Sequence, residues 1–237
     1  MKSTLKIWLI LFSLLLTGWK TIAGNASTVS PSTANVYMSS PVLPAEVRRV
    51  LVLPFACEGS SSDLTGGCQT MDPVLTAELV RNGKFETISA SPETLRSCTG
   101  KLSWTGEEAL PQDFFAGLKN VYACDAVMFC ELTSFHPNAP LVVGLRFKLA
   151  DVNSGKILWS ADEIFDAENP DISKGAQQFE KSRQPRHNFA YNAYSFVMWC
   201  VDTPTRSALD DQWNILHSPR YFGEYSMFEL LKTLPQR

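Results

Sequence analysis

The chain has 237 residues, of which 45% are hydrophobic and 11% aromatic, so it can build one domain of good size or two small ones. The net charge is −3, and no basic run is longer than the pair Arg48-Arg49. These features lack the electrostatic signature of a protein that binds nucleic acid or an anionic membrane surface, so neither is an expected partner.

Residues 1–23 have the pattern of an export signal. Lys2 and Lys6 precede the apolar run 7–16, and Ala23 supplies a small residue for cleavage before Gly24. The run is shorter than the roughly 20 residues of a membrane-spanning helix. We therefore expect an exported, periplasmic protein that is at most peripheral to the membrane. An uncleaved anchor is the alternative.

The end of this signal is similar to the box at which bacteria attach a lipid to an exported protein. Leu16-Thr17-Gly18 fits that box, but Trp19 stands where the lipid-accepting Cys is required, so we expect no lipid anchor. Residues 24–45 are rich in Ser, Thr, Asn, Ala and Pro and are predicted to form a disordered tether. Residues 46–237 are predicted to form a single α/β domain whose C-terminal part is helical and aromatic.

The first part of that domain alternates strand and helix signals. Residues 48–55, "RRVLVLPF", are too uniformly apolar for a strand with one wet face, so we place them centrally in a sheet. Asp72 is the expected N-cap of a helix that starts at Pro73 and ends at Gly83. "KFETIS" (84–89) is a second strand, and Ser91-Pro92 starts a short helix that ends near Gly100.

The middle of the domain is predicted as a helix followed by three strands. The helix covers 111–122, and the first strand is the apolar segment "CDAVMFCELTSF" (124–135). The segments 141–152 and 155–166 are joined at Asn153-Ser154-Gly155, which is a hairpin signal. A turn centred on Ser154 pairs Arg146 with Asp162, Phe147 with Ala161 and Leu149 with Trp159, which separates apolar and charged faces.

The C-terminal part contains helix signals and many aromatic residues. One helix follows Pro170, and another starts at Ser218-Pro219 and should dock on the sheet. Aromatic side chains dominate binding hot spots, although packing in the core is the alternative for these residues. The candidate partner surface consists of Phe189, Tyr191, Tyr194, Phe196, Trp199, Tyr221, Phe222 and Tyr225.

Six cysteines fit an oxidising compartment, and they allow fifteen pairings. Cys57 and Cys68 bracket the polar segment "EGSSSDLTGG", so a loop-closing disulfide between them is the preferred pair. The spacing of the cysteines does not match a zinc site, and we predict no metal and no cofactor.

No catalytic constellation stands out in the sequence. Asp162, Glu163 and Asp166 could form an acid/base set, but a charged edge that discourages strand pairing is the favoured interpretation. His136 is expected on a surface loop. Neither a phosphate-binding loop nor a G-x-S-x-G nucleophile motif occurs, so the chain is not expected to be an enzyme.

Several phrases over about residues 48–170 resemble a group of envelope domains. They are "RRVLVLPF", "GKFETI", "CDAVMFCELT" and the hairpin "LRFKLADVNSGKILWSAD". The group comprises the curli-secretion lipoprotein, the outer-membrane activators of penicillin-binding proteins and the amino-terminal domain of TolB. The resemblance implies a single mixed β-sheet with packed helices, in an anticodon-binding-like or TolB-like sandwich of two or three layers.

The same resemblance implies a function. We expect a non-catalytic protein that binds or helps assemble other envelope proteins, with its oligomeric state left open. One alternative is an accessory component of an outer-membrane secretion or assembly machine. An alternative of another class is a hydrolase with an unrecognised site.

Overall fold

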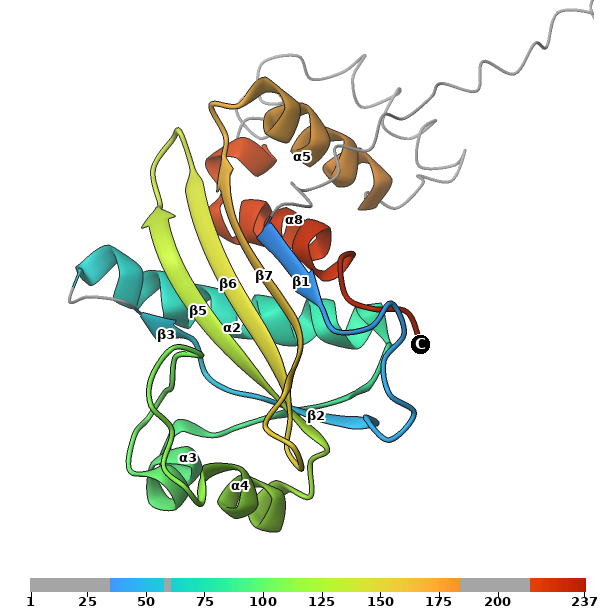
Figure 1. Cartoon of the computed structure of the whole chain (residues 1–237). Helices are drawn as coiled ribbons and strands as arrows, with labels where there is room; N and C mark the ends of the chain where they lie inside the picture. Colours follow the sequence, from blue (N-terminus) through green and yellow to red (C-terminus); the bar gives the residue numbers. More distant parts are fainter. Residues whose placement is uncertain (1–34, 58–60, 184–213) are drawn as a thin grey trace, which may run out of the picture.

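The computed structural model describes residues 35–57, 61–183 and 214–237. Figure 1 shows one β-sheet with helices on both of its faces. The strands are β1 (Val36–Met38), β2 (Arg49–Val52), β3 (Ala56–Cys57), β4 (Glu86–Ser89), β5 (Ala126–His136), β6 (Val142–Asp151) and β7 (Ile157–Asp166). The helices are α2 (Ser62–Asn82), α3 (Pro92–Thr99), α4 (Phe114–Tyr122), α5 (Pro170–Arg183), the 3₁₀ turn η3 (Ile215–His217) and α8 (Pro219–Leu231).

The sheet is mixed, which confirms the predicted α/β class. Its strand order is β1-β7-β6-β5-β2-β4, and β3 pairs with β5. Strand β2 is parallel to both β4 and β5, whereas β5, β6, β7 and β1 are antiparallel to their neighbours. Because β2 has a strand on each side and is covered on both faces, its residues Val50 and Leu51 are fully buried, as the uniform apolar run predicted.

Two hydrophobic clusters lie on opposite faces of the sheet. The larger one packs the faces of β5, β6 and β7 against α2 and α8, which lie behind the three long strands in Figure 1. The smaller one packs the β2 end of the sheet against α3 and α4. The molecule therefore has three layers at the β2 end, while α3 and α4 leave part of the second sheet face uncovered over β6 and β7.

The β6–β7 hairpin has the predicted register. Arg146 pairs with Asp162, Phe147 with Ala161 and Leu149 with Trp159. Phe147, Leu149 and Trp159 are buried against the helices, while Arg146 and Asp162 lie on the opposite face. The predicted separation of apolar and charged faces is confirmed.

The predicted tether differs from the structure at its C-terminal end. Residues 36–38 form strand β1, which pairs antiparallel with β7, and Leu43 is buried in the larger cluster. Leu43 also donates its N–H to the carbonyl of Gln236, and the Gln236 N–H bonds to the carbonyl of Pro41. An edge strand needs only one partner strand, so a short apolar triplet inside a polar segment is enough to form it. The signal and residues 24–34 lie outside the described residues.

Helix α2 begins ten residues before the predicted N-cap Asp72. Its N-cap is Ser61, and Pro73 lies inside the helix. The Asp72 carboxylate accepts the N–H of Phe55 at 3.0 Å, so it ties the segment between β2 and β3 to the helix instead of capping it. An added Cβ at Gly67 would come within 2.7 Å of the side chains of Leu132 and Phe135. Gly67, one of the glycines in the segment that suggested a loop, therefore lets the helix approach β5 closely.

Several other helix boundaries follow the sequence signals, although α4 begins at Phe114 and not at the predicted residue 111. Gly83 and Gly100 end α2 and α3 with φ angles of 66° and 87°, in the left-handed region that glycine favours. Ser218 is the N-cap of α8, as predicted.

Candidate functional site

The uncovered part of the second sheet face carries a row of polar side chains. Successive residues of a strand point to opposite faces, so Arg146 and Lys148 of β6 lie on the same face as Ser160 and Asp162 of β7. Tyr37 of β1 is opposite Ser160 in the register and belongs to the same face. The sheet thus presents cations, hydroxyls and an aromatic ring side by side.

Arg146 is the centre of a charge network. Its Nε lies 2.7 Å from Oδ2 of Asp162, and its Nη1 lies 3.3 Å from Oε1 of Glu131 and 3.5 Å from Oε1 of Glu107. The hydrogen bond to Asp162 is the main reason that the pKa of Arg146 is raised. One guanidinium therefore links β5, β6, β7 and the loop between α3 and α4.

The α3–α4 loop is attached to the sheet through Lys148. The Nζ of Lys148 lies 3.3 Å from the carbonyl oxygen of Gly106 and 3.4 Å from Oε1 of Glu107. The base of the same loop is fixed by the Trp104 indole N–H, which donates to Oγ1 of Thr99 at 2.8 Å, and by the ion pair of Lys101 with Glu108. These contacts hold one wall of the site in place.

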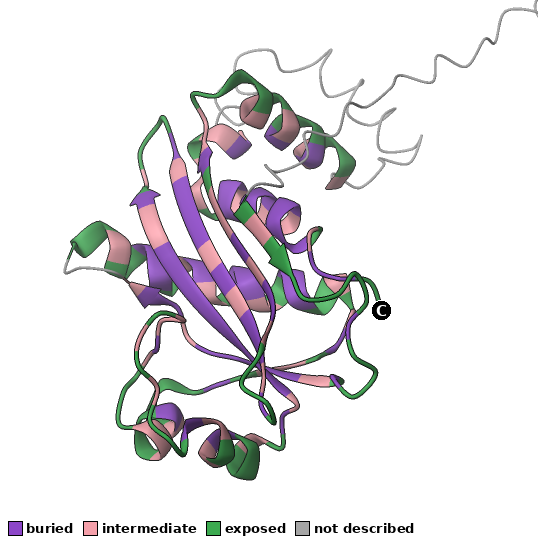
Figure 2. Cartoon of the chain, viewed as in Figure 1, coloured by how far each residue is buried: buried purple, intermediate pink, exposed green. Residues whose placement is uncertain are grey.

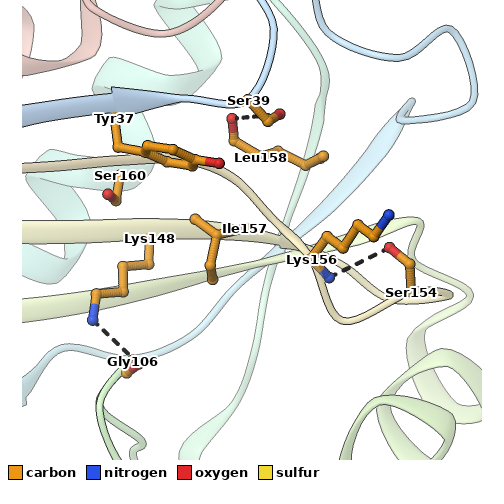
Figure 3. A pocket seen from close by; sticks show the side chains of 9 residues that line it. All are labelled: Tyr37, Ser39, Gly106, Lys148, Ser154, Lys156, Ile157, Leu158 and Ser160. Carbon is orange, nitrogen blue, oxygen red and sulfur yellow. Dashed lines mark hydrogen bonds between the residues drawn. The ribbon is translucent and has the colours of Figure 1, made fainter.

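Between this loop and β1 lies a hollow of about 540 Å³. Figure 3 shows its lining, in which Lys148 points toward Gly106 and the Tyr37 ring lies near Ser160. The lining contains two ammonium groups, four hydroxyls and apolar side chains, and no carboxylate. We call this the β7 hollow, and its residues are Tyr37, Ser39, Gly106, Lys148, Ser154, Lys156, Ile157, Leu158 and Ser160.

The β7 hollow can bind a ligand but offers no evident group for catalysis. Its hydroxyls and ammonium groups can donate hydrogen bonds, and the ring of Tyr37 and the side chain of Ile157 can make apolar contacts. No His or Cys lines the hollow. The lining is suited to a polymer chain that carries both acidic and apolar groups.

The predicted acidic residues do not converge, because the pleat places Glu163 on the face opposite to Asp162 and Asp166. Asp162 is bound to Arg146, while its neighbour Glu163 is opposite Leu145, a residue of the other face. Asp166 and the exposed His136 line a second hollow of about 350 Å³ together with Asp63. Within the described part of the chain, no cluster of three or more His, Cys, Asp or Glu could hold a metal ion.

The predicted aromatic partner surface is divided by the structure. Phe189, Tyr191, Tyr194, Phe196 and Trp199 lie outside the described residues. Phe222 and Tyr225 are buried in the larger cluster, so they contribute to the core and are not available to a partner. Burial and the nearby Glu229 raise the pKa of Tyr225 to about 12. Tyr221 is partly buried and packs against the same cluster.

The preferred cysteine pair forms a disulfide. Cys57 at the end of β3 is bonded to Cys68 in the second turn of α2. Cys98, Cys124 and Cys130 are free thiols, and burial raises the pKa of both Cys124 and Cys130. The disulfide fixes the start of α2 beside β5 on the helix-covered face, away from the β7 hollow.

Tyr37 and the α3–α4 loop were not identified as site residues from the sequence. The triplet Val36-Tyr37-Met38 has high β-propensity within a polar segment, and this was the one local signal for β1. The contact of Glu107 with Lys148 joins residues 41 positions apart, and no local pattern could have predicted it.

Comparisons with known proteins concern the fold. No family model and no curated protein matches the chain. Among solved structures, it is similar to the PelC dodecamer from Paraburkholderia phytofirmans, with 16% identity over 59% of this chain and 87% of that chain and a TM-score of 0.38. It is also similar to lipoprotein GNA1162 from Neisseria meningitidis, with 17% identity over 66% of this chain and 99% of that chain and a TM-score of 0.37. A third similar structure is the LpoB C-terminal domain from Escherichia coli, with 20% identity over 50% of this chain and 82% of that chain and a TM-score of 0.33.

In the described ranges, none of the helices is both long enough and apolar enough to cross a membrane.

Proposed function

We propose that this is a non-catalytic protein of the bacterial cell envelope that binds other envelope proteins through the β7 hollow. The observation that carries the proposal is the hollow itself, which is open to solvent and is bordered by the α3–α4 loop and β1, both fixed to the sheet. Tyr37 at its rim is 54% exposed, and Lys156 is exposed beside it. Aromatic and cationic side chains placed together on a fixed surface are typical of binding hot spots.

The frame of the hollow supports a binding role because little order has to be acquired on association. Arg146 and Lys148 already hold the α3–α4 loop on the sheet, and β1 is fixed by its pairing with β7. A preformed site loses less conformational entropy when a partner binds than a site that must first assemble.

The proposed location rests on the sequence outside the described residues. Residues 1–23 direct export, cleavage occurs between Ala23 and Gly24, and Trp19 prevents lipid attachment. Residues 24–34 then serve as a spacer before β1. Intact-mass measurement of the purified chain should give a form that starts at Gly24, and a chain that retains Met1 would contradict the cleavage.

A crosslinking experiment tests the binding role. A photoreactive amino acid at Tyr37 in living cells should capture an envelope protein, whereas the same group at Val121 should not capture that protein. Val121 is a matched control because it is 52% exposed but lies on α4, outside the hollow. Equal capture at both positions would contradict the proposal.

The captured partner should then be purified and its affinity measured. Tyr37→Ala is expected to weaken binding by about tenfold or more, because it truncates an aromatic hot-spot residue. Val121→Ala should leave the affinity unchanged. An unchanged affinity for Tyr37→Ala would remove the β7 hollow from the interface.

A further inference from the structure

Strand β1 is the edge strand at one end of the sheet, and its outer side can accept a further strand. Among the described strands it pairs with β7 alone. Ser39 donates its N–H to the carbonyl of Leu158 at 3.0 Å, and antiparallel pairing alternates, so Tyr37 also directs its N–H toward β7. Val36 and Met38 therefore direct their N–H and C=O groups away from the sheet.

This edge is complementary to a second copy of itself. If two β1 strands run antiparallel with Tyr37 opposite Tyr37, Val36 of each copy is opposite Met38 of the other. These are the residues whose backbone groups point outward, so the two strands can form four hydrogen bonds without a bulge. A register shifted by one residue would place an inward-pointing residue opposite an outward-pointing one, and the ladder would be lost.

The side chains at this edge are apolar and exposed. Tyr37 and Met38 are 54% and 46% exposed, and Figure 2 shows β1 as an exposed strand on the sheet. In the two-fold arrangement, Tyr37 of one copy contacts Tyr37 of the other on the face of the β7 hollow. Met38 contacts Val36 of the other copy on the opposite face. Cross-strand aromatic and apolar pairs of this kind stabilise sheets.

The charges along the edge are also complementary under a two-fold rotation. Beside β1, the C-terminal half of β7 and the turn that follows it carry Asp162, Asp166 and Glu168, while Lys156 directly precedes the N-terminal end of β7. The rotation reverses strand direction, so Lys156 of one copy comes level with Ile164 of the other, between Asp162 and Asp166. The two β7 strands are then three strand spacings apart, about 14 Å. Because the lysine side chain is long, its ammonium group can come closer to the carboxylates of the other copy than the backbones do.

We propose that the protein forms a two-fold dimer in which the β1 strands pair and the two sheets become one continuous sheet. The backbone register, the apolar side chains and the charges all fit a second copy of this chain. A single acidic peptide would satisfy the lysine but would find the acidic end of β7 repulsive. Both β7 hollows stay open in this dimer and lie on the same face, with the two Tyr37 rings between them.

The first test is sedimentation velocity on the mature chain, purified from cells after export, over a wide range of concentrations. The wild-type chain should show a reversible monomer–dimer equilibrium. Met38→Pro removes the outward N–H and leaves the bonds of Tyr37 and Ser39 to β7. It deletes two intermolecular hydrogen bonds per dimer and should weaken dimerisation by about tenfold or more. Met38→Leu keeps the N–H and should dimerise like the wild type.

The second test is a crosslink that reports the register. A non-hydrogen-bonded antiparallel pair brings two Cα atoms to about 4.5 Å, which a disulfide can span. Tyr37→Cys should therefore form a covalent dimer under mild oxidation. Val42→Cys, equally exposed but beyond the paired residues, should not form one.

Three results would overturn the proposal. One is a wild-type chain that stays monomeric at every concentration. A second is a dimer that Met38→Pro leaves unchanged, because its interface would then lie elsewhere. The third is a monomer whose β1 edge pairs with an extended segment of a different protein. A photoreactive group at Tyr37 that captures a second copy of this chain supports the dimer, whereas capture of a different envelope protein supports the proposed binding role, so the two proposals are distinguishable.

Discussion

At the scale of single residues, Arg146 is the side chain on which the uncovered sheet face depends. Its Glu131 partner has only 4% of its side chain exposed, and Arg146 itself has 24% exposed. Removal of one member of such a pair leaves the other as an unpaired charge in a poorly solvated position. The resulting loss in the free energy of unfolding is larger than the contribution of the intact pair. The side chain therefore stabilises the fold and shapes the β7 hollow.

We predict that Arg146→Met lowers the free energy of unfolding by about 2–4 kcal/mol, measured by urea denaturation at neutral pH. Glu86→Ala is the matched control, because it removes an ion pair with Arg49 in which the glutamate is 64% exposed. That change should cost less than about 1 kcal/mol. Equal losses for the two variants would contradict the role given to Arg146.

Asp72 gives a prediction about pH. Burial is the largest influence on its carboxyl group and raises its pKa, while the hydrogen bond from Phe55 acts in the opposite direction. The folded chain therefore binds this proton more tightly than the unfolded chain, and stability falls as the pH rises through the native pKa. Ionised Asp72 is a source of instability at neutral pH.

Asp72→Asn keeps an oxygen that can accept the Phe55 N–H and removes the buried charge. It should raise the free energy of unfolding at pH 7, and the gain should disappear below the ordinary carboxyl pKa of 3.8, where both states are protonated. Urea denaturation across this pH range measures the effect. The exposed Asp113→Asn controls for the loss of one charge, and a gain of equal size there would refute the assignment to Asp72.

At the scale of elements, the Cys57–Cys68 disulfide joins β3 to the first half of α2. It closes a segment with a sequence separation of 11 residues. A loop of this length restricts the unfolded chain, so the double change Cys57→Ser and Cys68→Ser should cost about 2–3 kcal/mol under oxidising conditions.

Urea denaturation of the oxidised chain measures this cost, and Cys98→Ser, which removes a free thiol, should change the stability by less than about 0.5 kcal/mol. In the presence of a reductant, the wild type should lose the same amount and the double variant should not change. A double variant as stable as the oxidised wild type would contradict the role of the bond.

Elements defined by local signals were predictable from the sequence. The β6–β7 register follows from the Asn-Ser-Gly turn and from alternation on both strands, and the ends of α2 and α3 follow from glycine. The start of α2 was not predictable, because Asp72 has the residue type of a cap but finds its partner in Phe55, 17 residues away.

Helix α8 docks on the sheet, as predicted, since it contacts β6 and β7. Of the two interpretations of its aromatic residues, packing in the core holds for Phe222 and Tyr225. In the structure α8 contacts α2, α5, β6 and β7, so nearly all of its circumference is covered. A helix that is apolar on every side is usually a buried helix.

At the scale of the whole molecule, the sequence predicted the fold class but not the position of the site. The α/β alternation and the hairpin are sufficient to specify a mixed sheet with helices packed on it. The β7 hollow arises where β1, the β6–β7 hairpin and the α3–α4 loop meet, and these segments are far apart in the chain. Such a meeting depends on tertiary contacts, which no local pattern encodes.

The positions of the helices on the two sheet faces explain why the second face remains uncovered over β6 and β7. Helices α3 and α4 are short and cover the β2 end of the sheet, while α2 and α8 cover the opposite face. The long strands of the hairpin extend beyond α3 and α4, and their exposed surface becomes polar at that point. The molecule thus has one sheet face that helices cover along the long strands and one that is partly open, where we propose that a partner binds.

Strand β1 also determines how the domain would respond to mechanical load. The first described residues pair with β7, and residues 41–43 then run beside Gln236 near the C-terminus. A pull on the N-terminal segment would therefore stress the three-residue β1 ladder first, and the backbone bonds to Gln236 second. Apart from Leu43, the large cluster between α2, α8 and the sheet would come under load only after both had yielded, so separation of β1 from β7 would protect the core.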